Sequence, residues 1–459
     1  MSVNTITGRS AFLSLLKDEG VTHLFGNPGT TELPIMDALT EHPDLTYMMS
    51  MQESLVVYMA EGYSRASGKL SACNVHVAPG LGNAMGAIYA AKFANTPIII
   101  TAGQQELGHG LTEPMLYDSL VPIAAPLVKW AVEVPRFQDL PRIVRRAAKI
   151  AMTPPMGPVF ISLPGDILNE EDALELGSRT RVDTKVRPVD ASLDRLADRI
   201  LTAKNPVIIS GHELATDDAL QEAADFASVV GCPVYQQTVQ YGAHFLSEHP
   251  AFMGALTRDQ QQVRDILSPY DLLIVLGADV LRMSVWAEVE PLPEGMPIVQ
   301  IGQRDWEMGK NFPTEMAVRA DIKETLKVLN PLIEARGGAE QTARAKLALE
   351  KLASSNWSAK RKTLTDKLGS NVTTGVIDPS WMVMKVVDTM PDDTIVVDEG
   401  IISTRALPAL LPYRNSASLF GLASGGIGWG VPAACGVQAA YPDRPVIAII
   451  GDGSSMYSI

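Results

Sequence analysis

Val446-Ile447-Ala448-Ile449-Ile450-Gly451-Asp452-Gly453-Ser454 joins a short run of apolar residues to a turn rich in glycine. Such a run is too short to cross a membrane and is typical of a strand buried in a parallel sheet. Residues that directly follow such a strand lie at the carboxyl end of the sheet, where doubly wound folds bind ligands. The stretch therefore predicts an α/β fold with a ligand-binding turn around residue 452.

The first part of the chain alternates between helical and strand patterns. We expect an α/β domain over residues 1–180, with helices at 7–19, 32–39, 53–67 and 82–95 and strands at 22–25, 72–77, 97–102 and 159–163. Strand, turn and helix repeating in this way predict a doubly wound parallel sheet.

Two further α/β domains are expected downstream. A charged segment at about 167–192 is interpreted as a linker, and a central domain follows over 190–335, with strands at 206–211, 232–235, 271–277 and 297–301. A polar helical connector at about 341–367 leads to a third domain over 370–459, with strands at 394–398, 417–419 and 446–450. Because no helix of full length follows the last strand, we expect this third domain to be incomplete at its C-terminus.

Composition limits the class of protein. The 459 residues are 46% hydrophobic and 20% charged, as in ordinary globular proteins, and the formal net charge of −14 argues against nucleic acid or an anionic membrane as a partner. We find no signal-peptide pattern and no apolar window of membrane-spanning length. Cys73, Cys232 and Cys435 lack metal-ligand spacing, so we expect three buried thiols in a reducing, cytoplasmic compartment.

Glu53 is the first candidate catalytic residue. It opens the predicted helix at 53–67, just after Met51-Gln52 and downstream of the Asn27-Pro28-Gly29-Thr30 turn. If buried among apolar neighbours, its carboxyl group would exchange protons near neutral pH. The competing interpretation is a helix-start glutamate that offsets the helix dipole, and the residue alone does not decide between the two.

Two glycine-rich turns are candidate ligand sites. Gly425-Gly426-Ile427-Gly428 contains no GxGxxG fingerprint, which disfavours a nicotinamide cofactor. In Gly451-Asp452-Gly453-Ser454-Ser455, glycine lets the backbone approach a diphosphate, and Asp452 offers the hard oxygen that magnesium requires. Each turn could also be a simple conformational turn.

Taken together and in order, these motifs resemble the thiamine diphosphate-dependent decarboxylases, a family that includes pyruvate decarboxylases and acetolactate synthases, and within it the benzoylformate decarboxylases. The resemblance covers nearly the whole chain. It runs through Phe25-Gly26-Asn27-Pro28-Gly29, Gln52-Glu53, Asn74-Val75-His76, Gly82-Asn83-Ala84-Met85-Gly86, Thr101-Ala102-Gly103-Gln104, Pro126-Leu127-Val128-Lys129-Trp130, Gly157-Pro158-Val159 and the two glycine-rich turns.

The resemblance implies a role for each site residue. Glu53 would activate the cofactor's pyrimidine ring, with the Gly425 carbonyl accepting from its amino group and Ile427 bending the cofactor. The diphosphate would lie near Gly453, Ser454 and Ser455, and Asp452 would bind Mg²⁺. His76 would transfer protons and Thr30 would bind the substrate. Met115 and Leu116 match apolar pocket positions, although core packing is an equal alternative.

The resemblance also has departures. Thr30 stands where the benzoylformate enzymes have a serine, and Ser284 stands near the position of their second pocket histidine. Serine cannot shuttle protons as imidazole does near neutral pH. His109 could substitute for that histidine or be a surface residue. Glu399-Gly400-Ile401-Ile402-Ser403 lacks the hydroxyl side chains that contact the cofactor in those enzymes.

Three functional hypotheses follow from the resemblance. The first is a decarboxylase for an aromatic or bulky 2-oxo acid that forms a homodimer or homotetramer, with each cofactor shared between two chains. The second is a carboligase of the acetolactate synthase kind. The third is an inactive cofactor-binding or scaffold protein.

Overall fold

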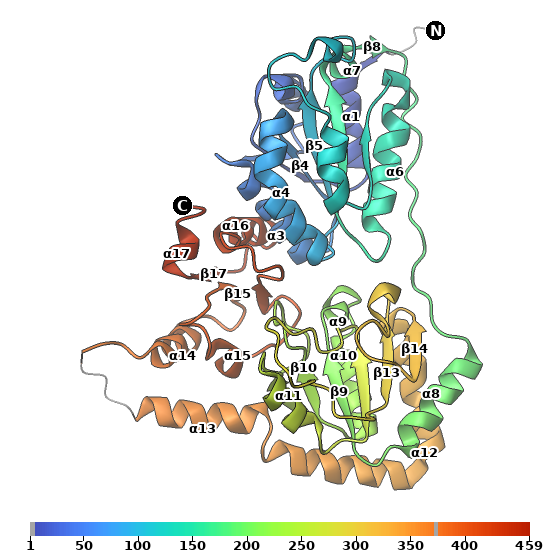
Figure 1. Cartoon of the computed structure of the whole chain (residues 1–459), viewed down its shortest axis with the longest axis vertical. Coiled ribbons are helices and arrows are strands. Elements are labelled where there is room, and N and C mark those ends of the chain that lie inside the picture. Colours follow the sequence, from blue (N-terminus) through green and yellow to red (C-terminus); the bar gives the residue numbers. More distant parts are fainter. Residues whose placement is uncertain (1–4, 371–374) are drawn as a thin grey trace. The chain divides into compact units, whose positions relative to one another are not determined.

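The computed structural model describes residues 5–370 and 375–459 and divides the chain into two compact units. One unit combines Met1–Val182 with Leu422–Ile459, and the other is Asp183–Gly421. Figure 1 shows that helices and strands alternate along both units. None of the described helices has the length and apolar character that a membrane span requires.

A six-stranded sheet forms the centre of the first unit. Its order is β3-β2-β4-β5-β7-β6, and every neighbouring pair is parallel. The strands are β2 His23–Gly26, β3 Thr46–Met49, β4 Ser71–Val75, β5 Ile98–Gln104, β6 Ala131–Glu133 and β7 Val159–Pro164. The interior strands β4, β5 and β7 are buried along their whole length, as expected for a parallel sheet covered on both faces.

Helices cover this sheet. They are α1 Gly8–Asp18, α2 Leu33–Ala38, α3 Glu53–Ser67, α4 Val77–Phe93, α5 Leu120–Ala124, α6 Leu140–Met152 and α7 Gly165–Asn169. Helices α1 and α6 pack together, as do α3 and α4. The carboxyl end of β4 at Val75 leads almost directly into α4 at Val77, and the carboxyl edge of such a sheet is where doubly wound folds place their ligands.

The C-terminal segment contributes α16 Gly430–Ala440, β17 Val446–Ile450 and α17 Asp452–Ser455 to the first unit. Helix α16 packs against α3, as Figure 1 shows. A side chain at Gly62 would collide with the backbone of Ala433, and one at Gly436 would collide with the Met59 carbonyl. The two helices thus approach to backbone contact at their glycines.

Helix α16 also corrects one expectation about the cysteines. Cys73 and Cys232 are buried, but Cys435 is exposed, so the prediction of three buried thiols is wrong for Cys435. The helix buries Ala433, Gly436 and Val437 on one face, and Cys435 lies away from that face. A small-residue helix gives no clear apolar periodicity, so the sequence did not reveal which face is outside.

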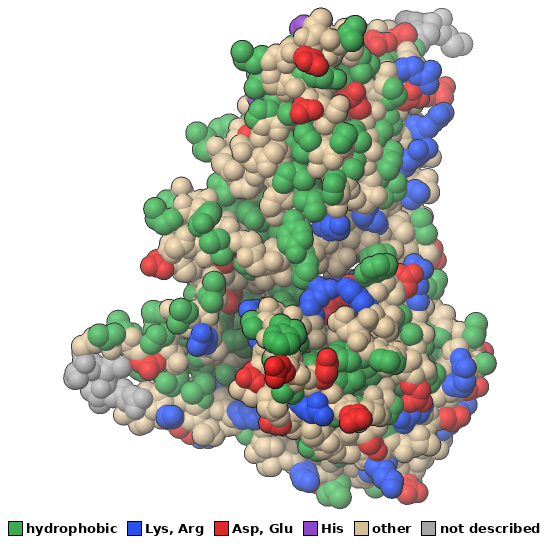
Figure 2. Space-filling view, in the orientation of Figure 1, with side chains coloured by type: hydrophobic (Ala, Val, Ile, Leu, Met, Phe, Trp, Pro, Cys, Tyr) green, Lys and Arg blue, Asp and Glu red, His purple; other side chains and the backbone are tan. Residues whose placement is uncertain are grey.

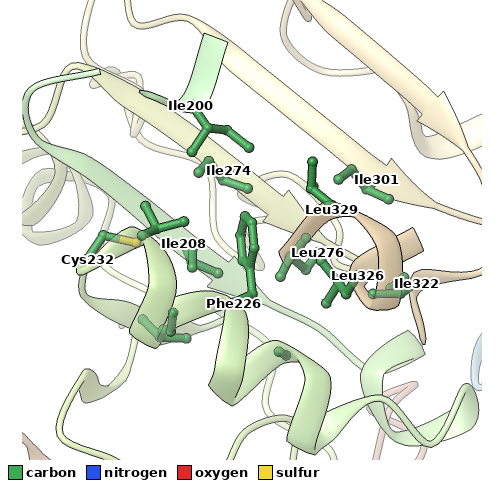
Figure 3. Packing of buried hydrophobic residues seen from close by; sticks show 14 of the residues in the cluster. Ile200, Ile208, Phe226, Cys232, Ile274, Leu276, Ile301, Ile322, Leu326 and Leu329 are labelled. Atoms are coloured by element: carbon green, nitrogen blue, oxygen red, sulfur yellow. The ribbon is translucent and has the colours of Figure 1, made fainter. Parts of the chain in front are cut away.

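A second six-stranded parallel sheet forms the core of the other unit, with order β11-β10-β9-β12-β13-β14. The strands are β9 Pro206–Ser210, β10 Val234–Gln236, β11 Phe252–Ala255, β12 Leu272–Leu276, β13 Ile298–Gly302 and β14 Met316–Arg319. The helices α8 Asp190–Thr202, α9 Glu213–Thr216, α10 Leu220–Val230, α11 Gln260–Leu267 and α12 Ile322–Ala353 flank it. Figure 3 shows Phe226 of α10 and Leu326 and Leu329 of α12 packed with strand residues in its core.

The rest of the second unit holds a third, small parallel sheet. Its strands β15 Ile395–Glu399 and β16 Leu419–Gly421 pair in parallel, and α13 Trp357–Gly369, α14 Pro379–Thr389 and α15 Leu407–Leu410 accompany them. The predicted fold class, α/β with three parallel-sheet domains, is confirmed. Figure 2 shows Lys, Arg, Asp and Glu side chains interspersed on the visible face of residues 183–421, as the charged composition leads one to expect.

Candidate active site

Glu53 is the first residue of α3, and the preceding side chain fixes that start. Gln52 Oε1 accepts from the backbone N–H groups of Ser54 at 2.8 Å and Leu55 at 3.3 Å, which caps the helix. The Glu53 carboxylate is partly exposed, and its Oε2 accepts from Asn83 Nδ2 at 3.1 Å. Gly80 lies beside the carboxylate, since an added Cβ there would be 3.1 Å from Oε1. The acid is therefore positioned by α4 and still accessible.

Glu32 is a site residue that the sequence analysis missed. Its side chain is fully buried and accepts from Gly29 N at 2.8 Å, Gly103 N at 2.7 Å and Thr31 Oγ1 at 2.8 Å. Its fourth partner is His76, whose Nδ1 lies 2.8 Å from Glu32 Oε2. The sequence does contain one signal for Glu32: it stands three residues after Gly29, the residue before a helix, and this is the position of glutamate in a capping box.

His76 takes its orientation from this carboxylate. The hydrogen bond to Glu32 raises the pKa of His76; partial burial opposes this, and the charges of Glu32 and Glu53 add to it. Because Nδ1 faces Glu32, Nε2 is the nitrogen left for a substrate. A side chain at Gly29 would collide with the imidazole, so only glycine allows the ring to lie against this turn.

The backbone after His76 is strained. Val77, the first residue of α4, has φ +44°, a conformation that β-branched residues rarely adopt. Such strain persists where the surrounding structure fixes it and is concentrated at functional sites. Here it holds the imidazole at the carboxyl end of β4.

The neighbouring residues Thr30 and Thr31 have different surroundings in the structure. Thr30 is exposed, whereas Thr31 Oγ1 lies 3.1 Å from His76 Nδ1 and also donates to Glu32. The hydroxyl group that organises the histidine therefore belongs to Thr31. Thr30 remains the candidate for substrate contact because its side chain is open to solvent.

The turn Gly425-Gly426-Ile427-Gly428 is shaped by two left-handed residues. Gly425 has φ +82° and Gly428 has φ +94°. A Cβ on Gly425 would meet open space, whereas one on Gly428 would lie 2.7 Å from Tyr457 Cβ. Between them Ile427 is 38% exposed, so its aliphatic side chain is presented outward, as a residue that supports a cofactor must be.

Asp452, Gly453, Ser454 and Ser455 form the short helix α17 directly after β17. Asp452 and Gly453 are exposed, an added Cβ at Gly453 would meet nothing, and Ser454 is buried. Across residues 5–370 and 375–459, no three His, Cys, Asp or Glu side chains are grouped to hold a metal. One carboxylate and an open glycine backbone nevertheless fit Mg²⁺ that takes its other ligands from a diphosphate.

Several other predicted positions lie at the surface. Met115 is 84% exposed and Leu116 is 41% exposed, so these residues do not pack in the core. His109 is exposed on the same loop, and Ser284 is exposed in the other unit.

The parallel strands end at glycine-rich turns, and the site combines an acid, Glu53, with a histidine, His76, that a carboxylate holds in place. One turn carries Asp452, whose carboxylate oxygen is the kind of ligand that Mg²⁺ prefers. Together these features define a cofactor-dependent α/β enzyme. Three family models of thiamine pyrophosphate (TPP) enzymes match the chain. The model of the N-terminal TPP-binding domain matches residues 6–116, that of the central domain matches residues 193–329, and that of the C-terminal TPP-binding domain matches residues 406–459. Thiamine pyrophosphate is another name for thiamine diphosphate.

Curated relatives agree with this class. A benzoylformate decarboxylase of Pseudomonas aeruginosa is 33% identical over 99% of this chain and 82% of its own. An acetolactate synthase large subunit of Haemophilus influenzae is 26% identical over 99% of this chain and 79% of its own. The chain belongs to the thiamine diphosphate-dependent decarboxylase and acetolactate synthase family.

Solved structures show the same similarity. A putative thiamine diphosphate-dependent enzyme from Mycobacterium smegmatis superposes with a TM-score of 0.85 at 33% identity, over 99% of this chain and 84% of that one. A 4-hydroxybenzoylformate decarboxylase from Rhodococcus jostii superposes with a TM-score of 0.86 at 28% identity, over 98% of this chain and 82% of that one.

Proposed function

We propose that the protein catalyses the non-oxidative decarboxylation of an aromatic or bulky 2-oxo acid to an aldehyde and carbon dioxide, with thiamine diphosphate and Mg²⁺. The observation that carries the proposal is the His76 imidazole held by the fully buried Glu32, close enough to Glu53 for that charge to raise the pKa of His76. The relatives named as benzoylformate decarboxylases support the choice of substrate.

When bound, thiamine diphosphate would supply the carbon nucleophile for the substrate ketone and the acceptor for the electrons released with carbon dioxide. Glu53 exchanges a proton with the pyrimidine ring, while Asn83 holds its carboxylate in place. His76 holds a proton at Nε2 and gives it to the substrate. Thr30 Oγ1 donates to the substrate carboxylate.

The cofactor-binding residues act at the other end. The Gly425 carbonyl would accept from the pyrimidine amino group, and the Ile427 side chain would support the cofactor. Asp452 would hold Mg²⁺, and Gly453, Ser454 and Ser455 would bind the diphosphate with backbone N–H and hydroxyl groups.

The exposed apolar loop between β5 and α5 supports a bulky substrate. Leu107, Leu111, Met115 and Leu116 are all at least 40% exposed within it. Large apolar side chains left exposed on one loop are the kind of surface that ligands cover. We therefore expect an aromatic ring to be covered by this loop.

An acetolactate synthase-like carboligase is the second candidate, motivated by Ser284 and by the synthase relatives. Many such synthases hold a flavin, and the residues of the central sheet do not fit a dinucleotide at the usual place. That place is the crevice at the carboxyl ends of β9 and β12, where the strand order reverses.

Ion pairs of the protein itself fill this crevice. Glu213 Oε2 accepts from Gln303 N at 2.6 Å, and Glu213 Oε1 accepts from Arg304 Nε at 2.8 Å. Arg304 Nη2 also lies 2.9 Å from Asp279 Oδ1. The Glu213 carboxylate therefore already uses the Gln303 backbone N–H and the Arg304 guanidinium, the donors that the diphosphate of a flavin dinucleotide would need. A central domain that does not fit a flavin favours the decarboxylase over the synthase.

Turnover of benzoylformate tests the proposal. The full-length protein with thiamine diphosphate and Mg²⁺ is expected to release carbon dioxide and benzaldehyde from benzoylformate faster than it releases carbon dioxide from pyruvate. The same assay with pyruvate and an acceptor aldehyde detects a carboligase, and a flavin absorption band in the purified protein would favour the synthase. Absence of turnover with every 2-oxo acid would reject both enzymes.

We also propose a homodimer or homotetramer in which Glu53 and Asp452 of each site come from different chains. Mixing Glu53→Gln with Asp452→Ala subunits is then expected to restore activity, because a hybrid dimer has one site without either change. A random mixture would recover about a quarter of the wild-type activity. Each variant alone is the control.

The competing outcome is a site built within one chain, since α3 packs against α16 of the same chain. In that case every hybrid site carries one change, and the mixture stays as inactive as its components. The measurement is turnover after joint refolding, with hybrid formation checked by two different affinity tags.

The cellular location is proposed to be the cytoplasm. Cys73, Cys232 and Cys435 are free thiols, which is typical of a reducing compartment. Fractionation of cells that express the protein tests this.

A further inference from the structure

The loop between β5 and α5 begins beside the candidate active site. Gly103 N donates to Glu32 Oε1 at 2.7 Å, and Glu32 is the carboxylate that holds His76. Strand β5 ends one residue later, at Gln104. Residues 105–119, here called the β5–α5 loop, therefore leave the sheet next to the group that orients the imidazole. The proposed chemistry gives no role to the polar side chains of this loop.

The returning half of the β5–α5 loop contains a tight turn over residues 114–117. Tyr117 N donates to the Pro114 carbonyl at 3.0 Å, which closes a four-residue β-turn. Leu116, the third residue of the turn, has φ +70°, the sign that a type II turn requires, whereas the commoner type I turn needs about −90° there. Type II turns favour glycine or asparagine at this position, because other residues are strained at positive φ. The turn is therefore held in a conformation that leucine disfavours.

Gln105 bonds to the peptide group that distinguishes the two turn types. Types I and II differ by about half a turn of the peptide between the second and third residues, which here joins Met115 to Leu116. Gln105 Nε2 donates to the Met115 carbonyl of that peptide at 3.1 Å. A rotated carbonyl would point away from Gln105, so this hydrogen bond stabilises the strained turn relative to type I.

A second glutamine fixes the base of the β5–α5 loop. Gln104 Nε2 donates to the Asp118 carbonyl at 2.8 Å, and Gln104 Oε1 accepts from Gln105 N at 2.9 Å. These contacts hold the two ends of the loop together whichever way the Met115 carbonyl points. They keep Gln105 within reach of the turn, and they leave the choice of turn type to its side chain.

We infer that Gln105 is a positioning residue for substrate binding: it holds the turn at residues 114–117 in its strained form, so that Leu116 presents its side chain to a bulky 2-oxo acid. The inference rests on the proposed function, because it requires the β5–α5 loop to cover the substrate. Leu116 is 41% exposed in the present turn, and a rotated peptide would redirect this side chain. Backbone strain persists only where neighbouring groups enforce it, and Gln105 is such a group.

Gln105→Met tests the inference because it keeps the length of the side chain and removes the amide donor. The loss of one hydrogen bond between neutral groups shifts an equilibrium by roughly two- to twelvefold. With saturating thiamine diphosphate and Mg²⁺, we expect the KM for benzoylformate to rise about fivefold and kcat to stay within about twofold of the wild type. Steady-state kinetics measure both, and a general loss of active protein would lower kcat instead.

Chymotrypsin cleavage after Tyr117 gives a readout that needs neither substrate nor cofactor. Tyr117 closes the turn, so its peptide bond becomes accessible only when the turn opens. Gln105→Met is expected to raise the rate of cleavage there about fivefold, because proteolysis follows the population of the open loop. Mass spectrometry of the fragments identifies the cleaved bond.

Leu116→Gly shows whether the effect of Gln105 comes from the turn type. Glycine adopts positive φ without strain, so this turn should stay in its type II form without help from Gln105. In the Leu116→Gly background, Gln105→Met is therefore expected to raise cleavage after Tyr117 by less than about twofold. An equal increase in both backgrounds would show that Gln105 adds a contact without selecting the turn, and the inference would be wrong.

Gln341→Met is the matched control in the other unit. Gln341 Nε2 donates to the Val229 carbonyl at 2.8 Å, near the end of α10. Because this glutamine is more deeply buried than Gln105, its variant is expected to lower the melting temperature at least as much. It should leave the KM for benzoylformate and the cleavage after Tyr117 unchanged. The two variants thus separate positioning from general stability.

Gln105→Asn replaces Gln105→Met if the latter does not fold, since its amide is one methylene too short to reach the Met115 carbonyl. An unchanged rate of cleavage after Tyr117 overturns the inference, and so does an unchanged KM beside faster cleavage. If the wild type does not turn over benzoylformate, the proposed substrate fails and the role in binding it fails too. The cleavage assay then still decides whether Gln105 holds the turn, so the two failures are distinguishable.

Discussion

Glu53→Gln is expected to fold normally and to lose turnover by roughly 10²- to 10⁴-fold, the usual contribution of a general acid–base group. A glutamine can still accept the hydrogen bond from Asn83 Nδ2, and the position is partly exposed, so the cost in stability is small. It cannot exchange a proton with the pyrimidine ring, so the reaction should stop before the substrate is attacked. The measurement is kcat at saturating cofactor, together with the melting temperature.

Glu222→Gln is the matched control for Glu53→Gln. Glu222 also lies in the first turn of a helix, α10, where a glutamate offsets the helix dipole. This control should retain full turnover. If Glu53→Gln also retained turnover within a factor of about two, Glu53 would be only a helix-start glutamate, and the scaffold hypothesis would replace the enzyme.

Elements whose limits are set by nearby residues were predicted well from the sequence. Helix α3 runs over Glu53–Ser67 as expected, because Gln52 caps its start and Gly68, with φ +67°, ends it. Strand β17 runs over Val446–Ile450 as expected, because a glycine follows a continuous apolar run. In both cases the signal and the boundary are within a few residues of each other.

Elements that depend on distant partners were missed or misplaced. Strands β3 Thr46–Met49 and β6 Ala131–Glu133 lie at the two edges of their sheet, are partly exposed and lack a strong apolar run. Pairing with β2 and β7 defines them, and a sequence does not display that pairing. Helix α4 begins at Val77 rather than at the predicted Gly82, because the strained Val77 turns the chain before Pro79 and Gly80.

The candidate site follows the same division. Glu53, His76 and the glycine-rich turns were predicted because each belongs to a local motif. Glu32 was missed because its four partners come from three separate segments, with Gly103 lying 71 residues away. A charged residue in a sequence looks solvated by default, and only the fold reveals that it is buried and satisfied. Glu61, which is also buried and accepts a hydrogen bond from Trp429 Nε1 at a separation of 368 residues, is a more extreme case.

His76→Ala is the second variant with a large expected effect, a loss of turnover of roughly 10²- to 10⁴-fold at all pH values. Glu32→Gln should reproduce part of that loss, and only at alkaline pH. The charge and hydrogen bond of Glu32 raise the pKa of His76, whereas burial lowers it, so the variant should have a lower His76 pKa. The alkaline limb of the pH–rate profile should then move to lower pH. Glu133→Gln, whose partner is Ser162, is the control and should not move it.

The stability of Glu32→Gln has a definite dependence on pH. A histidine whose pKa is raised by folding contributes stability that is fully present below its unfolded pKa of about 6.5 and is lost as the pH rises through the folded pKa. The difference in unfolding free energy between wild type and Glu32→Gln should therefore be largest in mildly acidic buffer and should shrink above the folded pKa of His76. Denaturant unfolding on both sides of that pKa, with an NMR titration of the imidazole, measures both quantities. An unchanged His76 titration in the variant would show that Glu32 does not set the protonation of this histidine, and the proton-transfer role given to the pair would have to be abandoned.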